Sequence, residues 1–233
     1  MKRLFMNSLE QVHCFVAEVW QETKESSKKF PELFRNGEPK YPIPFFGNLL
    51  KAEIFTVGLN PSADEFKNRG WQDGISNESL ANRLLDYFSS PHDWFRIWSE
   101  ALGLLSGSPN YARGRVAHLD VSPRATQSFG GFSPEQSKQF DQMVRQDIRW
   151  LFHLITQSTN LKLILMAGTA SKKCYLDRLT RECAGRYSCW LTDRQSANGV
   201  QCRHWRLETE GKCIPVFFSG SSRDFMDGRW AAA

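Results

Sequence analysis

Asparagine, aspartate and serine side chains stand at the ends of four apolar runs of this sequence, next to glycine or proline. The four segments are Gly58–Ser62, Asp120–Pro123, Gly168–Lys172 and Ser219–Arg223. Asn and Asp side chains can orient a water molecule and can read the hydrogen-bonding edge of a base. Serine hydroxyls and backbone amides can bind phosphates. The four segments therefore favour hydrolysis or recognition of a nucleic acid.

The same segments do not match the common nucleotide and acyl-transfer motifs. The chain has no GxGxxG sequence, and Gly168–Lys173 lacks the second glycine and the spacing of a P-loop. The run Ser219-Gly-Ser221 is not a GxSxG nucleophile elbow. These absences leave a water-orienting or base-reading role for the polar strand ends.

The apolar runs before these segments predict buried strands, separated by stretches with helical spacing. We expect strands over residues 52–58, 115–121, 161–167 and 213–218, helices over 6–27, 77–90, 93–105 and 133–157, and a further helix opening at 168–171. A hairpin is expected over 189–207, around Asn198-Gly199. This alternation predicts an α/β three-layer sandwich, in which helices flank a central, mostly parallel four-stranded sheet, with a C-terminal β-hairpin insertion over 185–212.

We expect one domain over residues 1–233, with an N-terminal helical extension over 1–40. In a parallel sheet, ligands bind beyond the carboxyl ends of the strands, so all four polar segments would lie at one edge. Short apolar strands and a hydrophobic content of 41% are sufficient for a buried core.

The composition excludes several classes of protein. The formal net charge of +5 permits DNA as a partner but is too small for binding by charge alone. No apolar run approaches the length of about 18 residues that a membrane span needs, so we expect a cytoplasmic monomer that contacts no membrane. Six cysteines form no CxxC pair, and free thiols are favoured over a metal site around Cys174–Cys213. We expect no metal and no cofactor.

Three motifs together resemble the uracil-DNA glycosylase superfamily. Val57-Gly-Leu-Asn-Pro-Ser62 is similar to its first motif, in the Gly-x-Asn-Pro form of the mismatch-specific uracil and thymine glycosylases. Phe217-Phe-Ser-Gly-Ser-Ser-Arg223 resembles its last motif, and Leu163–Gly168 resembles the strand between them. The matches span residues 43–225, and their order carries the resemblance more than any one of them.

The resemblance implies a role for each matching residue. Asn60 would position the attacking water, and an oxocarbenium-like transition state needs little more than that orientation. Gly58, Leu59 and Asp120 would surround the flipped base, with Phe46 or Phe66 stacking on it. The DNA backbone would be held by Pro61, Ser62, Lys172, Ser219, Ser221, Ser222, Arg223 and Phe225, of which the last two occupy the position of a wedge. Each also has a plainer explanation: a turn, an exposed loop residue or a core ring.

Two departures from the family pattern shape the predicted specificity. Phe217 stands where the family has a His or Asn beside the leaving base, and Phe218 stands where it has Pro. Asp120 stands where uracil-reading members have Asn. An ionised Asp only accepts hydrogen bonds, which suits the exocyclic amine of cytosine and repels O4 of uracil; a protonated Asp120 would donate to cytosine N3. Alternatively, Asp120 caps a turn with Ser122 or pairs with Arg124.

The chain is therefore expected to be a monofunctional DNA N-glycosylase that removes a modified cytosine and leaves an abasic site. Loss of ordinary cytosine would destroy the host's own DNA, so a bulky mark such as glucosylated hydroxymethylcytosine of phage DNA fits better. The hairpin adds side chains suited to such a mark: Trp190, Asp193, Arg194, Gln195 and Trp205. Three alternatives stay open: a uracil or mismatch-thymine glycosylase, a metal-dependent hydrolase using His118 and Asp120, and a non-catalytic binder of modified DNA.

Overall fold

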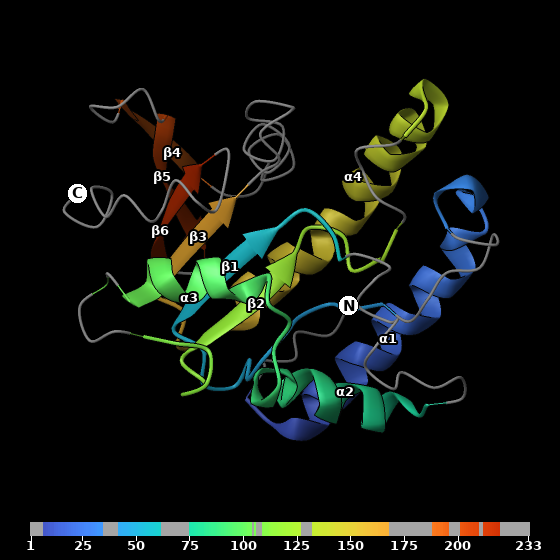
Figure 1. Cartoon of the computed structure of the whole chain (residues 1–233), viewed down its shortest axis with the longest axis horizontal. Helices are drawn as coiled ribbons and strands as arrows, with labels where there is room; N and C mark the ends of the chain where they lie inside the picture. Colours follow the sequence, from blue (N-terminus) through green and yellow to red (C-terminus); the bar gives the residue numbers. More distant parts are fainter. Residues whose placement is uncertain are drawn as a thin grey trace.

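The computed structural model describes residues 7–34, 42–61, 75–103, 105, 109–126, 132–167, 188–195, 201–209 and 212–219. Their strands form one sheet with the order β2-β1-β3-β6-β5-β4 (Figure 1). The strands are β1 (Ile54–Gly58), β2 (Val116–Asp120), β3 (Leu163–Ala167), β4 (Ser188–Gln195), β5 (Gln201–Thr209) and β6 (Lys212–Ser219).

The first four strands of that order are parallel, as the sequence predicted. The hairpin β4–β5 is also present, and it pairs antiparallel with β6. The hairpin therefore continues the central sheet, which becomes mixed and six-stranded. The α/β prediction of four parallel strands with a C-terminal hairpin is confirmed, and the new feature is that the hairpin belongs to the same sheet.

Helices cover both faces of this sheet (Figure 1). Helix α3 (Phe95–Gly103) lies across one face, and α4 (Pro134–Gln157) passes behind the other. Helices α1 (Leu9–Ser27) and α2 (Asn77–Leu85) lie side by side beyond β2, and two short 3-10 helices, η1 (Pro31–Leu33) and η4 (Tyr87–Ser89), follow α1 and α2. The three layers are those expected for alternating strands and helices.

Local sequence signals set where the long helices begin. Ser133 caps α4 with Gln136 in a reciprocal capping box, and Pro134 occupies the first turn, where its missing N–H costs no helical bond. Ser8 and Gln11 form the same box at α1. Helix α1 is part of the fold, since Val12, Phe15 and Val16 are buried in the central core.

The register of the parallel strands brings their carboxyl ends level with one another. Gly58 pairs with Asp120, Val57 pairs with Met166, and Ala167 pairs with Ser219. The last residues of β2, β1, β3 and β6 therefore form one row across the sheet. The expectation that the polar strand ends meet at one edge is confirmed for the residues that are described. Within the described ranges, no helix is long and apolar enough to cross a membrane.

Candidate functional site

Asp120 lies at the carboxyl end of β2 with its side chain over Gly58 of β1. The carboxyl group is almost fully buried, with the residue 7% exposed. A Cβ atom at Gly58 would lie 2.5 Å from Asp120 Oδ1 and 3.2 Å from His118 Nε2. Real Cβ atoms essentially never approach another atom to 2.5 Å, and 3.2 Å is tighter than most Cβ contacts, so glycine at this position makes room for the Asp120 carboxyl group above β1.

A chain of buried polar side chains leads away from Asp120. Nε2 of His118 lies 3.6 Å from Asp120 Oδ1, which is longer than a hydrogen bond. Nδ1 of the same ring is 2.8 Å from Thr56 Oγ1, and Thr56 Oγ1 is 2.7 Å from the Tyr111 hydroxyl. Thr56 and His118 pair in the β1–β2 register, so adjacent strands position them on the same face of the sheet.

Burial raises the pKa of Tyr111 above its ordinary range; the Thr56 hydrogen bond opposes this shift, and the charge of Asp120 adds to it. Tyr111 is therefore a protonated hydroxyl, able to donate a hydrogen bond. Four side chains, Tyr111, Thr56, His118 and Asp120, thus form a buried polar column that ends at the carboxyl edge of the sheet.

Aromatic rings surround His118 on the sides that do not face Thr56 or Asp120. The ring centroids of Phe95, Trp94, Phe46 and Trp98 lie 5.1, 5.2, 5.8 and 6.2 Å from that of His118. Three of these rings are buried, but Trp94 is 44% exposed. Trp94 precedes α3, so the start of this helix presents a large ring to solvent beside the buried column.

Asn60 follows β1 and is held by the loop that follows β2. Its Nδ2 donates to Thr126 Oγ1 (2.8 Å), to the carbonyl oxygen of Pro61 (3.0 Å) and to that of Arg124 (3.2 Å). These bonds fix the orientation of the carboxamide. Its carbonyl oxygen, Oδ1, is consequently the group that this side chain can offer to a water molecule.

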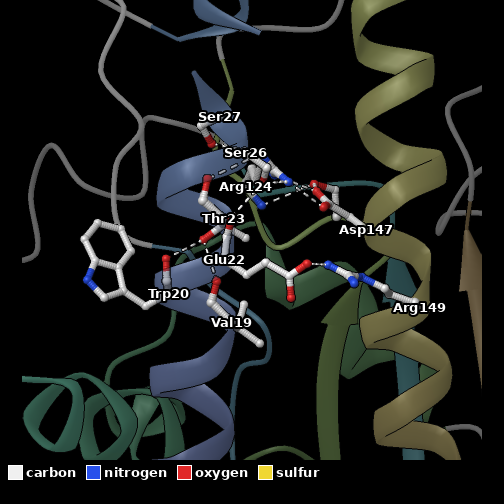
Figure 2. A network of polar contacts seen from close by, with 10 residues as sticks. Val19, Trp20, Glu22, Thr23, Ser26, Ser27, Arg124, Asp147 and Arg149 are labelled. Atoms are coloured by element: carbon white, nitrogen blue, oxygen red, sulfur yellow. Dashed lines mark hydrogen bonds and ion pairs between the residues drawn. The ribbon is translucent and has the colours of Figure 1, made fainter. Parts of the chain in front are cut away.

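Arg124 anchors that loop to two helices (Figure 2). Its Nε and Nη2 atoms donate to Asp147 of α4 at 2.8 and 2.7 Å. Its Nη1 and Nη2 atoms donate to Ser27 and Ser26 of α1 at 2.9 and 2.8 Å. Ser122 donates to Asp147 as well, at 2.6 Å. Burial raises the pKa of Asp147, while the Arg124 guanidinium and the Ser122 hydroxyl favour its charged form.

This network speaks against the two plainer explanations for Asp120, a turn cap with Ser122 and an ion pair with Arg124. Ser122 and Arg124, the two partners that a turn-capping or ion-pairing Asp120 would use, both bind Asp147. Asp120 instead faces His118. Its carboxyl group therefore belongs to the polar column and not to the network around Arg124.

Other predicted site residues have different surroundings. Phe46 is 2% exposed and packs against Tyr87 and Phe95, so its ring supports His118 and offers no open face for stacking. Leu59, expected beside the flipped base, and Pro61, expected at the DNA backbone, are both buried. Pro61 contributes a carbonyl oxygen to the anchoring of Asn60.

Phe217 is half-buried in β6, in the row of Leu165, Thr56 and His118. Strands lie about 4.8 Å apart, so roughly 14 Å separates Phe217 from His118 across the sheet. Ser219 ends β6 in the row that contains Ala167. The remaining predicted residues lie outside the described residues: Ser62, Phe66, Lys172, Ser221, Ser222, Arg223 and Phe225. The turn at 198–199, the helix expected from residue 168 and the side chains of the hairpin strand Ser188–Gln195 also lie outside what is described.

No cluster of three or more His, Cys, Asp or Glu side chains suited to a metal occurs among the described residues. His118 and Asp120 do adjoin each other, as their spacing on one strand requires. Cys14 and Cys213 are free and exposed. The described residues thus place two neighbouring groups at the strand end, and both groups can form hydrogen bonds and exchange protons.

Sequence reasoning missed three residues of this site: Thr56, Tyr111 and Trp94. Thr56 stands inside an apolar strand, where a threonine is ordinary. Tyr111 lies in the loop before β2, where no local pattern connects it to Thr56, 55 residues earlier. The signal in the sequence was Thr56 itself, because a polar residue in the middle of a fully buried strand needs a hydrogen-bond partner.

Comparison of the chain with protein-family models, with curated proteins and with solved structures finds no match.

Proposed function

We propose that the protein is a DNA N-glycosylase that hydrolyses the N-glycosidic bond of a flipped, modified cytosine and leaves an abasic site. The observation that carries the proposal is the position of Asn60 and Asp120 at the carboxyl ends of neighbouring strands. Asn60 follows β1, and Asp120 ends β2. These two strands are adjacent and parallel, and Gly58 pairs with Asp120, so both side chains come from the same edge of the sheet. This is the place where an open α/β sheet binds its ligand.

In the proposed reaction, Asn60 Oδ1 accepts a hydrogen bond from a water molecule and orients its oxygen toward C1′ of the sugar. The C1′–N bond breaks as the water oxygen forms its bond to C1′, and the base leaves with the bonding electron pair. The water loses one proton to solvent and the departing base takes one up, which gives a hydroxyl at C1′ and a neutral base. The fixed Nδ2 of Asn60 supports this role, because a water held in one orientation avoids much of the entropic cost of attack.

Asp120 reads the base in this proposal. A buried carboxylate that accepts a hydrogen bond from the exocyclic amine would favour cytosine derivatives over uracil, whose O4 is also an acceptor. The exposed ring of Trp94, beside His118, supports the same proposal, since a base taken out of the duplex needs a surface on which to stack. The identity of the cytosine modification is set by groups other than these three.

The direct test supplies the purified full-length protein with duplex and single-stranded oligonucleotides. They carry uracil, a G·T mismatch, 5-hydroxymethylcytosine or its glucosylated form, and abasic sites are measured after alkali cleavage. Release of a modified cytosine is expected. Release of uracil or thymine alone would replace the proposal with a repair glycosylase, and binding without base loss would replace it with a non-catalytic reader.

Two variants test the proposed roles. Asn60→Ala is expected to lower the excision rate by at least about 100-fold while leaving DNA binding largely intact, the loss typical of a group that acts in the transition state. Asn160→Ala is the matched control, because among the described residues the side chain of this exposed Asn donates to a backbone carbonyl, that of Leu50, 110 residues away in the sequence. Asp120→Asn should lose cytosine derivatives and gain uracil, and an unchanged preference would reject Asp120 as the reader.

A further inference from the structure

The buried polar column contains more hydrogen-bonding groups than packing of a core requires. Tyr111, Thr56 and His118 are 5%, 0% and 1% exposed, and each is linked to the next at hydrogen-bond distance. Burial of polar groups costs free energy unless they are paired, and a Phe, a Val and a Leu would fill such positions without that cost. An effect of the column on Asp120 would explain why polar groups are buried at these positions.

The direction of the hydrogen bonds follows from the proton of Tyr111. Thr56 Oγ1 is the acceptor that the described residues place at hydrogen-bond distance from the Tyr111 hydroxyl. If Tyr111 donates to Thr56, the hydroxyl proton of Thr56 is free to point at Nδ1 of His118, 2.8 Å away. Nδ1 then accepts, and the single proton of a neutral imidazole must reside on Nε2.

The opposite direction is less favourable. If Nδ1 carried the proton and donated to Thr56, Thr56 would donate to Tyr111, and the proton of Tyr111 would need an acceptor other than Thr56. A bare Nε2 would also direct its lone pair at Asp120 Oδ1 across 3.6 Å, which repels an ionised carboxylate. Both arguments place the proton on the nitrogen that faces Asp120.

We propose that Tyr111, Thr56 and His118 form a one-directional hydrogen-bond chain that fixes His118 in its Nε2–H form and so holds Asp120 as an acceptor for an exocyclic amino group. His118 is thus a positioning residue. Its Nε2 faces Oδ1 of Asp120 at 3.6 Å, and Oδ2 is left for the substrate. We expect this contact to shorten to a hydrogen bond when substrate binds, as contacts in catalytic sites often do. The assignment of the His118 tautomer rests on the geometry alone. The preference for bases that carry an amino group rests on the proposed glycosylase function.

The surroundings of His118 keep other charges away from it. The described elements packed against its ring contribute Phe46, Trp94, Phe95 and Trp98, none of which ionises. Asp120 and Tyr111 are the titratable groups that the described residues bring to the column. The tautomer of His118 is therefore controlled by Thr56 on one side and by Asp120 on the other.

Nitrogen-15 spectra of the histidine rings in the labelled full-length protein test the chain without any substrate. The His118 signals are identified by their loss in His118→Gln. At neutral pH the wild type is expected to show a protonated Nε2 and an unprotonated Nδ1, and Thr56→Val and Tyr111→Phe are expected to convert this to a mixture of tautomers. A protonated Nδ1 in the wild type, or a tautomer unaffected by both variants, would overturn the proposal.

Excision of a modified cytosine gives the second readout. Thr56→Val and Tyr111→Phe are each expected to slow it about tenfold, the factor that one net hydrogen bond is worth, while Thr56→Ser retains the hydroxyl and stays within about threefold of wild type. Thr156→Val is the matched control, because this threonine of α4 bonds the backbone of its own helix. Equal loss in Thr56→Ser, which retains the hydroxyl, and in Thr56→Val, which lacks it, would mean that the site responds to any change of this side chain and not to the hydroxyl itself, which also contradicts the chain.

The two readouts separate the two proposals. If no substrate is cleaved but His118 has the expected tautomer and responds to Thr56→Val, the glycosylase function fails and the hydrogen-bond chain stands. If cleavage is observed but the tautomer is not the expected one, the chain fails and the function stands.

Discussion

The side-chain amide of Asn60 donates a hydrogen bond to the backbone carbonyl oxygen of Arg124, 3.2 Å away. The guanidinium of the same Arg124 is buried between α1 and α4, where it binds Asp147, Ser26 and Ser27 (Figure 2). The residue proposed to orient water is therefore connected, through one arginine, to the two longest helices that the structure describes. Packing of these helices and placement of Asn60 are mechanically linked.

Asp147→Asn is expected to lower the free energy of unfolding by about 3–5 kcal/mol, because it leaves the buried Arg124 without its carboxylate. Denaturant unfolding at neutral pH measures this. Asp141→Asn, in an exposed i,i+4 pair with Arg145 on the same helix, is the control and should change stability by less than about 1 kcal/mol. Equal effects of the two substitutions would show that Arg124 is not tied to Asp147 as described.

Gly58→Ala is expected to displace the Asp120 carboxyl group and abolish base reading. The added methyl group would lie 2.5 Å from Asp120 Oδ1, and overpacking of a filled interior costs about 1–3 kcal/mol. Thermal unfolding and excision assays measure both effects. Gly103→Ala has open space around the new Cβ and lies at the end of α3, so it should leave both properties unchanged. Normal activity in Gly58→Ala would remove Asp120 from the site.

Trp94→Ala is expected to weaken binding of substrate DNA by about 1–3 kcal/mol, the usual loss for an aromatic ring that stacks on a base. Trp94→Phe should retain most of the affinity, because it keeps a π-face. Binding is measured by fluorescence anisotropy of a labelled oligonucleotide. Leu9, the other exposed large apolar side chain among the described residues, gives the control Leu9→Ala, which should bind as wild type does. Equal affinities for all three variants would argue against stacking on Trp94.

Glu53 is expected to make the stability of the sheet fall at acid pH. Hydrogen bonds from Arg115 and Lys162 lower the pKa of Glu53 from 4.5 to about 2. A carboxyl group whose pKa is lower in the folded state stabilises the fold above its unfolded pKa and loses this contribution as the pH falls. The Tm difference between wild type and Glu53→Gln should therefore be largest above pH 4.5 and should vanish near pH 2. Glu100→Gln, in a looser exposed pair with Arg96, is the control and should change the Tm little. A difference independent of pH would contradict the role of charge.

Much of this fold follows from local patterns in the sequence. Apolar runs ending in Gly58 and Asp120 became parallel neighbours, and Ser133 with Gln136 begins the helix where a capping box predicts it. These signals are local, and α4 buries an apolar stripe at helical spacing, formed by Phe140, Val144, Ile148 and Leu151. The level arrangement of the strand ends then follows from the parallel pairing itself.

The polar column and the arginine network could not be predicted in the same way. Tyr111 meets Thr56, and Arg124 meets Ser27 and Asp147, across separations of 55, 97 and 23 residues. Hydrogen bonds between residues so distant leave no periodic trace in the sequence. Arg124 had an obvious near partner in Asp120, four residues away, and only the three-dimensional arrangement shows that the more distant Asp147 binds it.

Strand β2 ends the sheet, yet its edge is not bare at His118. The backbone of Phe46 both donates to and accepts from the backbone of His118, at 2.7 and 2.9 Å, so this peptide cannot be used by an incoming strand. The ring of Phe46 also packs against the His118 side chain. The segment around Phe46 thus protects the main chain of His118 from the addition of a foreign strand, while the Phe46 ring holds the His118 side chain in place.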